Sequence, residues 1–176
     1  GYLSYILIGE VYDFNLAQKF GKWVMFDTGS NQCFFPVSAF QTFYKIFEKE
    51  IINGNCAANT GSNQIYHYYS CNTKFLEKNK LPDLNLIFNG WAYRFRTNDL
   101  MDSGIFQDVS VFQILFSPGQ SDYKFLIGEP ILTKYLFVFD GEKNRVGLYG
   151  DFRYNFRKYT RDPPIDYFLY YLWYFI

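Results

Sequence analysis

Short apolar runs, rather than long helical stretches, make up most of the first 150 residues. From Ile65 onward these runs alternate with a period of two, which is typical of β-strands because successive side chains point to opposite faces. The clearest hairpin signal is Asn89-Gly90, which lies between two apolar runs and suits a type I′ turn. The sequence predicts strands or strand-like runs over 3–11, 22–26, 65–70, 84–88, 91–95, 109–116, 125–127, 136–139 and 145–149.

One segment has a clear helical period. Its apolar residues recur at steps of three or four, and its charged residues Lys45, Glu48 and Lys49 occupy the other face. The apolar positions are Phe40, Phe43, Ile46, Phe47 and Ile51. A short turn or helix is also expected at 130–134, and a loop at 53–64. Many short strands with one clear helix predict a mainly β fold.

Composition and charge exclude several classes of protein. The chain has 176 residues, of which 49% are hydrophobic and 23% aromatic, so it can bury one sizeable core and is not intrinsically disordered. Lys plus Arg and Asp plus Glu each number 17, so the formal net charge is zero. Without an excess of positive charge the chain has no field that attracts phosphates, and we set nucleic-acid binding aside.

Three cysteines and one histidine limit metal and thiol chemistry. No CxxC pair is present, and His67 is the sole histidine, so a structural zinc site, which needs about four Cys or His ligands, is disfavoured. Cys56 and Cys71 bracket a polar loop, Ala57 to Ser70, and could close it as a disulfide. The alternative of three buried free thiols, Cys33 included, stays open.

The composition changes after Gly150. Residues 151–176 begin with a basic stretch and end in Tyr167 to Ile176, a run of apolar and aromatic residues. That run is too short to cross a bilayer, which takes about 20 apolar residues. An interfacial membrane segment, a clipped transmembrane helix and a tail packed onto the domain all remain open. The chain starts at Gly1, and we expect a fragment or a trimmed precursor.

The most informative stretch for function is Asp27-Thr28-Gly29-Ser30, which follows the apolar residues Val24-Met25-Phe26. A carboxylate at the end of a buried strand can be held in one orientation by nearby donors. The Gly29 N–H and the Ser30 hydroxyl are the nearest candidates. The tripeptide Asp-Thr-Gly alone is common and also fits an ordinary turn.

Three separate blocks set this stretch in context. The first is Met25 to Ser30, followed by Pro36 and the helical pattern. The second is Cys71 and then Leu81 to Gly90. The third is Leu126-Ile127-Gly128-Glu129, Tyr135, Val138-Phe139-Asp140 and Val146-Gly147-Leu148. In order and spacing, the chain from Leu3 to Gly150 resembles the C-terminal lobe of the pepsin-like aspartic proteases.

The resemblance implies a fold and a division of labour. The fold is one lobe of the acid protease fold, a closed, barrel-like β structure with a ψ-loop and one or two short helices. Asp27 would be one of two catalytic aspartates that share a proton and activate water for peptide hydrolysis, with no cofactor or metal. Thr28 would contact the matching loop of the other lobe, the Gly29 carbonyl would accept from the substrate backbone, and Ser30 would hydrogen-bond the Asp27 carboxylate. Ile127 and Gly128 would form the ψ-loop strand that supports this loop.

The resemblance also implies partners and a location. The partners are a protein or peptide substrate and an N-terminal lobe of the same precursor. The location is the secretory or endolysosomal pathway, with a membrane as a further partner if the tail is an anchor.

Several features depart from the family. Asn31 replaces a usual hydroxyl residue, Glu129 replaces an aspartate, and no cysteine lies between Trp91 and Ser121, so Cys56 is the expected partner of Cys71. No second Asp-Thr-Gly or Asp-Ser-Gly is present, and Asp108, Asp140 and Asp151 fit turn or surface positions.

Three interpretations stay open: half of an active endopeptidase, a homodimer that pairs two copies of Asp27, and an inactive peptide-binding module. A histidine-dependent hydrolase is disfavoured, because His67 lies in an aromatic strand.

Overall fold

The computed structural model describes residues 2–9, 18–61, 65–88, 91–104, 108–117, 125–143, 145–149 and 153–155. The strands are β1 (Tyr2–Ile8), β2 (Gln18–Phe26), β3 (Cys33–Pro36), β4 (Cys56–Thr60), β5 (His67–Asn72), β6 (Leu84–Phe88), β7 (Trp91–Phe95), β8 (Met101–Asp102), β9 (Val109–Phe112), β10 (Ile114–Ser117), β11 (Phe125–Ile127), β12 (Leu136–Asp140), β13 (Arg145–Tyr149) and β14 (Arg153–Asn155). The α-helices are α1 (Phe40–Ile52), α2 (Thr73–Lys78) and α3 (Glu129–Leu132), and the 3₁₀ helices are η2 (Val37–Ala39) and η3 (Thr97–Leu100). The prediction of a mainly β fold is confirmed.

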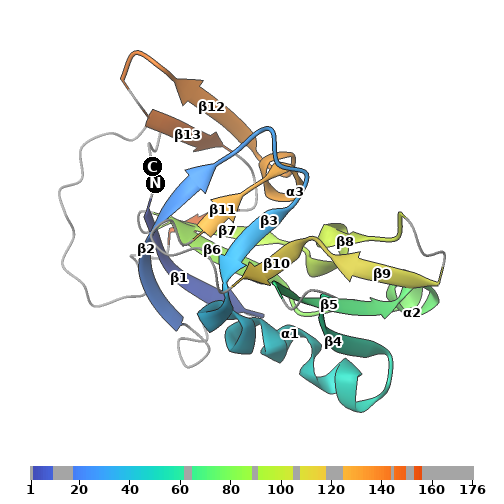
Figure 1. Cartoon of the computed structure of the whole chain (residues 1–176). Coiled ribbons are helices and arrows are strands. Elements are labelled where there is room, and N and C mark those ends of the chain that lie inside the picture. Colours follow the sequence, from blue (N-terminus) through green and yellow to red (C-terminus); the bar gives the residue numbers. More distant parts are fainter. Residues whose placement is uncertain are drawn as a thin grey trace.

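Twelve of the described strands form one continuous sheet that bends around the core (Figure 1). Its order is β14-β7-β6-β1-β2-β11-β3-β10-β5-β9-β8, with β4 added beside β5. Most neighbours are antiparallel, and the exceptions are the parallel pairs β2–β11 and β3–β10. Because parallel pairs need long connections, these two pairs join segments that lie far apart in the sequence.

The strand β11 lies between β2 and β3. Ile127 is in register with Phe26 of β2, and Leu126 is in register with Phe34 of β3. The residues that link β2 to β3 must therefore pass over the end of β11. This crossing, the ψ-loop arrangement, positions Asp27, the residue that directly follows β2.

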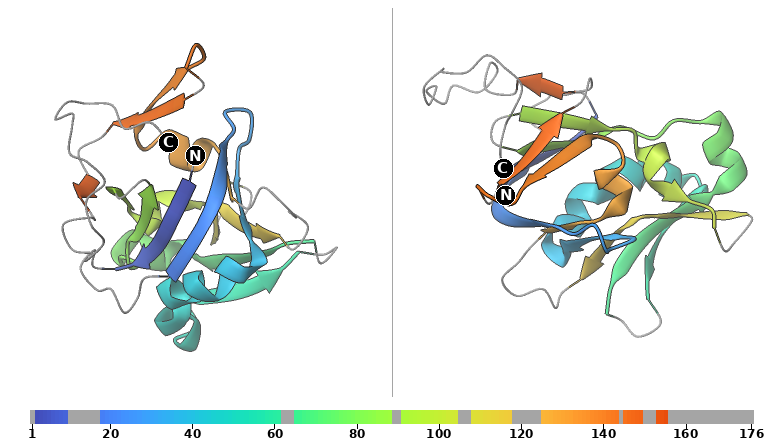
Figure 2. Two further views of the ribbon diagram at one scale, coloured as in Figure 1. Left: turned by 90° about the vertical axis from the view of Figure 1, so that its left-hand side faces the viewer. Right: turned by 90° about the horizontal axis from the view of Figure 1, so that it is seen from above.

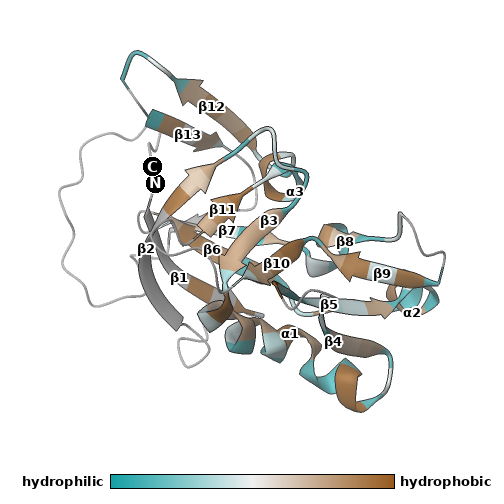
Figure 3. Ribbon diagram, in the orientation of Figure 1, coloured by the Kyte–Doolittle hydropathy of each residue, from teal (hydrophilic) through white to brown (hydrophobic). Residues whose placement is uncertain are grey.

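Helix α1 covers the core with its apolar face. The helix begins after Pro36 and the turn η2, and it is followed by Asn53 and by Gly54, whose φ is +76°. Phe43 and Phe47 are fully buried. Phe47 stacks on Tyr69 with 4.4 Å between ring centroids, and Phe43 meets Phe116 edge-on at 5.1 Å. Aromatic pairs at these spacings add to the stabilisation from buried area. Much of β3, β9, β10 and β11 is hydrophobic (Figure 3).

The hairpin of β12 and β13 forms a separate two-stranded sheet. Figure 2 shows it standing away from the twelve-stranded sheet. Phe137 anchors it, since its ring lies 5.5 Å from that of Phe26 in β2. Leu136 and Phe139 are 60% and 49% exposed. Phe137 therefore holds the hairpin against the core, while its neighbours Leu136 and Phe139 expose apolar surface.

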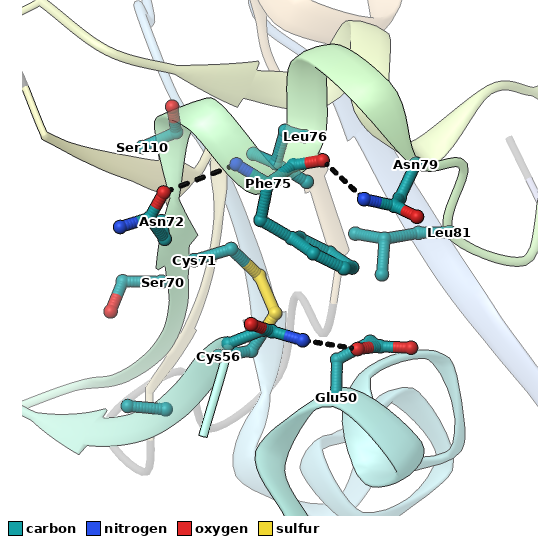
Figure 4. Close-up of a disulfide and its surroundings, with 12 residues drawn as sticks. Glu50, Cys56, Ser70, Cys71, Asn72, Phe75, Leu76, Asn79, Leu81 and Ser110 are labelled. Atoms are coloured by element: carbon teal, nitrogen blue, oxygen red, sulfur yellow. Dashed lines mark hydrogen bonds between the residues drawn. A yellow bond between two sulfur atoms is a disulfide. The ribbon is translucent and has the colours of Figure 1, made fainter. Parts of the chain in front are cut away.

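The expected loop at 53–64 contains the strand β4, which pairs with β5, the strand predicted at 65–70. β4 and β5 are antiparallel, and Cys56 lies directly opposite Cys71. A disulfide joins these two cysteines (Figure 4). Asn55, the residue before Cys56, donates a 2.8 Å hydrogen bond from Nδ2 to the Glu50 carboxylate. The bridge thus reinforces a strand pair next to the end of α1, and it does not close an irregular loop.

Other elements also differ from the sequence expectation. The run 109–116 is two strands, β9 and β10, because the chain breaks at Gln113. The segments β3 and α2 were not predicted from the sequence. Within 151–176, whose packing the sequence left open, β14 pairs with β7 and extends the sheet edge.

The aromatic run 167–176 lies outside the described residues. Within the described part of the chain, no helix has the length and hydrophobicity to cross a membrane.

Removal of the disulfide should destabilise the fold. The bridge spans 15 residues, and a closed loop of that size restricts the unfolded chain by an amount equivalent to about 3 kcal/mol. We expect the Cys56→Ala/Cys71→Ala variant to lose roughly 2–4 kcal/mol of unfolding free energy in urea titration. Equal midpoints for the double variant and the wild type would contradict this account.

Candidate active site

Asp27 lies immediately after β2, at the start of residues 27–32, here called the Asp27 loop. Its backbone N–H donates to the Ile127 carbonyl at 2.9 Å, which continues the β2–β11 ladder by one residue. Its carboxylate Oδ1 accepts the Gly29 N–H at 3.0 Å, and the Ser30 N–H donates to the Asp27 carbonyl at 3.3 Å. The side chain is only partly buried. The carboxylate is thus fixed by backbone groups while part of it faces solvent.

Gly128 lies directly beneath the Asp27 loop. A Cβ atom at this position would lie 2.2 Å from the Gln32 carbonyl oxygen and 2.6 Å from the Ser30 carbonyl oxygen. Its φ of −100° is open to any residue, so the close approach, rather than the backbone conformation, requires glycine. The Glu129 N–H donates to the Ser30 carbonyl at 2.8 Å, which ties the loop to α3.

The Ser30 hydroxyl has a different partner from the one that the resemblance implied. It donates to the Gln32 carbonyl at 2.8 Å, and within the described residues it makes no hydrogen bond to the Asp27 carboxylate. The hydroxyl has one proton, and the carbonyl two residues away accepts it. Ser30 therefore shapes the loop from within.

Thr28 and Gly29 are both exposed. They form the outward tip of the loop, where groups of another molecule could reach them. Met25, two residues before Asp27, is 44% exposed.

Cys33 supports the Asp27 loop from the core side, a role that the sequence analysis did not assign. The side chain is fully buried. The Gly128 N–H donates to its Sγ at 3.2 Å, and the Cys33 N–H donates to the Gln113 carbonyl at 3.0 Å. Burial raises the pKa of the Cys33 thiol to about 12, and it outweighs the lowering effect of backbone hydrogen bonds at Gly128 and Ile131. The thiol is therefore a neutral packing group and not a nucleophile.

Of the other aspartates, Asp140 has a structural role. Its carboxylate accepts Arg145 Nε at 3.0 Å and the Lys143 N–H at 3.1 Å across the β12–β13 turn. The hydrogen bond from Arg145 is the main reason that the pKa of Asp140 lies below its ordinary value. Asp108 is exposed beside β9, and Asp151 lies outside the described residues.

Comparison with known proteins agrees with this geometry. The family model for eukaryotic aspartyl proteases matches residues 9–149, which contain both the Asp27 loop and the strand β11 beneath it. The chain belongs to the eukaryotic aspartyl protease family. No curated protein matches the chain.

Two similar solved structures show the same fold. Basic 7S globulin from soybean has a TM-score of 0.59 and 21% identity, over 84% of this chain and 37% of the globulin. Conglutin gamma, a basic 7S globulin from lupine seeds, has a TM-score of 0.62 and 16% identity, over 89% of this chain and 38% of conglutin gamma. The chain therefore spans less than two fifths of the length of either globulin. Both structures carry the name of a globulin rather than that of a protease.

A methyl group at Gly128 should destabilise this aspartyl protease domain strongly. Both carbonyl oxygens that it would strike belong to the backbone, so neither can rotate away. We expect Gly128→Ala to lose at least about 2 kcal/mol of unfolding free energy in urea titration. Gly141→Ala is the matched control, because no atom lies within 4 Å of its added Cβ. It should stay within about 0.5 kcal/mol of the wild type. Equal losses in both variants would refute the close-approach explanation.

Cys33 should resist thiol reagents while the protein is folded. At pH 8 a buried thiol with a pKa of about 12 has almost no thiolate and no access to a reagent. We expect no labelling of Cys33 by iodoacetamide in native protein and full labelling in urea without reductant, as measured by peptide mass spectrometry. Rapid labelling in the native state would show that the packing beneath the loop is wrong.

Proposed function

We propose that this chain supplies one of the two catalytic aspartates of an aspartic-type endopeptidase. The observation that carries the proposal is the setting of Asp27: a partly exposed carboxylate at the end of a core strand, held by the Gly29 N–H and anchored through its own N–H to Ile127. A fixed carboxylate of this kind needs little reorganisation when it takes up or gives up a proton.

The reaction needs a second carboxylate. Two carboxylates at short distance share one proton, because both cannot be ionised together. The ionised group accepts a proton from a water molecule that attacks the peptide carbonyl, and the protonated group donates to the carbonyl oxygen. The sequence contains no second Asp-Thr-Gly or Asp-Ser-Gly, so an N-terminal lobe of the same precursor would supply this group.

Two exposed surfaces support the presence of such a lobe. Thr28 and Gly29 form the outward tip of the Asp27 loop, and Leu136 on β12 exposes an apolar side chain beside the core. Leu136 lies opposite Tyr149, which is 40% exposed, so both belong to one face of the hairpin. A second lobe that covered this face and the loop tip would bury apolar area and would bring its own groups to Asp27.

The cell compartment is also a proposal. The Cys56–Cys71 disulfide supports an oxidising compartment, as in the secretory pathway. A membrane contact through the tail 151–176 remains a prediction of the sequence.

A binding module without catalysis is the second candidate. Two observations favour it. Both similar solved structures are named globulins, and the Ser30 hydroxyl donates its hydrogen bond to the Gln32 carbonyl instead of to the Asp27 carboxylate. In that case the cleft would bind a peptide and release it intact.

Substitution of Asp27 should separate these functions. In protein that includes the upstream lobe, we expect Asp27→Asn to reduce peptide cleavage at acid pH by at least about 10²–10⁴-fold, since it removes a group that transfers protons. The measurement is kcat/KM on a fluorogenic peptide, with a transition-state peptide inhibitor as a second probe. Asp99→Asn, at an exposed carboxylate on η3, should keep full activity. If the Asp27→Asn protein cleaves as well as the wild type, the protease proposal fails. If the wild type binds peptide but never cleaves it, the binding module is favoured.

A further inference from the structure

A polar recess of about 330 Å³ adjoins the Asp27 loop. Asn31 and Gln32 of the loop form one wall, and residues of α3, β8 and β9 form the others. The volume falls at the lower end of the roughly 300–1,000 Å³ range of ligand pockets. No step of the proposed hydrolysis uses this recess.

The recess lies within reach of a bound peptide. Asn31 follows Asp27 by four residues, and four residues span at most about 14 Å when fully extended. The turn that joins the Ser30 N–H to the Asp27 carbonyl makes the true separation shorter. Residues two to four positions from the scissile bond of an extended peptide lie at a comparable distance, about 7–14 Å.

The walls of the recess suit a long cationic side chain. Asp102 and Glu129 supply carboxylates, and Gln113 supplies an amide oxygen as a further acceptor. Val111, which is half-buried, adds a small apolar surface. Lysine and arginine combine an aliphatic stem with a charged head, and they bury the stem on apolar surface while the head binds acceptors.

Lys134 also lines the recess, and its positive charge contributes to the net charge there. Its side chain is exposed, and the ion pairs seen among the described residues, Arg94–Asp83 and Arg145–Asp140, do not include it. Both recess carboxylates are likewise outside those pairs. With two carboxylates and one ammonium group, the recess has a net charge of −1 and favours a cation over an anion.

We propose that this recess is a substrate subsite that selects lysine or arginine two to four residues from the scissile bond. The inference rests on the proposed peptidase function, because it assumes that a peptide lies across Asp27.

The test uses protein that includes the upstream lobe and a peptide library randomised at four positions on each side of the cleavage site. Mass spectrometry of the products should show Lys or Arg enriched at one of these positions. We expect the Asp102→Asn/Glu129→Gln variant to lose about tenfold in kcat/KM for a peptide with Lys at that position. Its kcat/KM for the matched Met peptide should change less than about twofold.

These substitutions keep the local structure. Asp102 Oδ1 accepts the Gly104 N–H at 3.0 Å, and an asparagine keeps that oxygen. The matched control is Glu48→Gln/Glu77→Gln, which removes the same charge from exposed positions on α1 and α2. This control should leave the preference for Lys unchanged. A library profile without basic enrichment, or an enrichment that survives in the recess variant, overturns the proposal.

A failure of the proposed peptidase function can be told apart from a failure of the subsite proposal. If the wild type cleaves no peptide, fluorescence anisotropy with labelled Lys and Met versions of one library peptide tests the recess by itself. Binding of the Lys peptide about tenfold tighter in the wild type, and equal binding in the Asp102→Asn/Glu129→Gln variant, supports a cation subsite. Equal or undetectable binding of the two peptides in the wild type overturns it.

Discussion

The insertion of β11 between β2 and β3 is the constraint on which the rest of the structure depends. Because Ile127 and Leu126 occupy the pairing edges of both strands, β2 and β3 cannot pair with each other, and the chain between them has to cross the end of β11. Gly128 sits at that crossing, in contact with the Ser30 and Gln32 carbonyl oxygens. The orientation of the Asp27 carboxylate therefore follows from sheet topology and backbone contacts, with the Cys33 side chain supporting the loop from the core side.

The sequence predicted the two halves of this crossing but not all of its contacts. Asp27 to Ser30 and Ile127-Gly128 stand out as motifs, and their roles came from resemblance to a family. Their contact joins residues about 100 positions apart, as in the 95-residue separation of Cys33 and Gly128, and no local pattern contains it. For this reason the sequence assigned Cys33 no role beyond that of a free thiol. It also predicted that the Ser30 hydroxyl bonds to Asp27, whereas the hydroxyl bonds to the Gln32 carbonyl.

Burial explains which elements the sequence predicted well. All five residues of β6 are buried, and four of the five in β7 are buried or half-buried, so the apolar pattern marks both strands at their correct bounds. In β4 only Cys56 is buried, and the polar residues of this strand look like a loop. The strand exists because β5 offers it a pairing edge and because the disulfide joins the two. Strand β3 is four residues long and ends in proline, so its alternation of apolar residues is too short to predict a strand.

The same topology separates the assembly of the loop from the completion of a catalytic site. Hydrogen bonds within this chain shape the Asp27 loop: they involve Ile127, Gly29 and Glu129, and the Ser30 hydroxyl donates to the Gln32 carbonyl. The loop can therefore take its shape before any partner arrives. A carboxylate from a second lobe would then meet an acceptor already in place, and the water displaced by that contact would strengthen the coupling between the two groups. In the proposed function, association of the lobes and the sharing of a proton between Asp27 and the second carboxylate would thus be a single event.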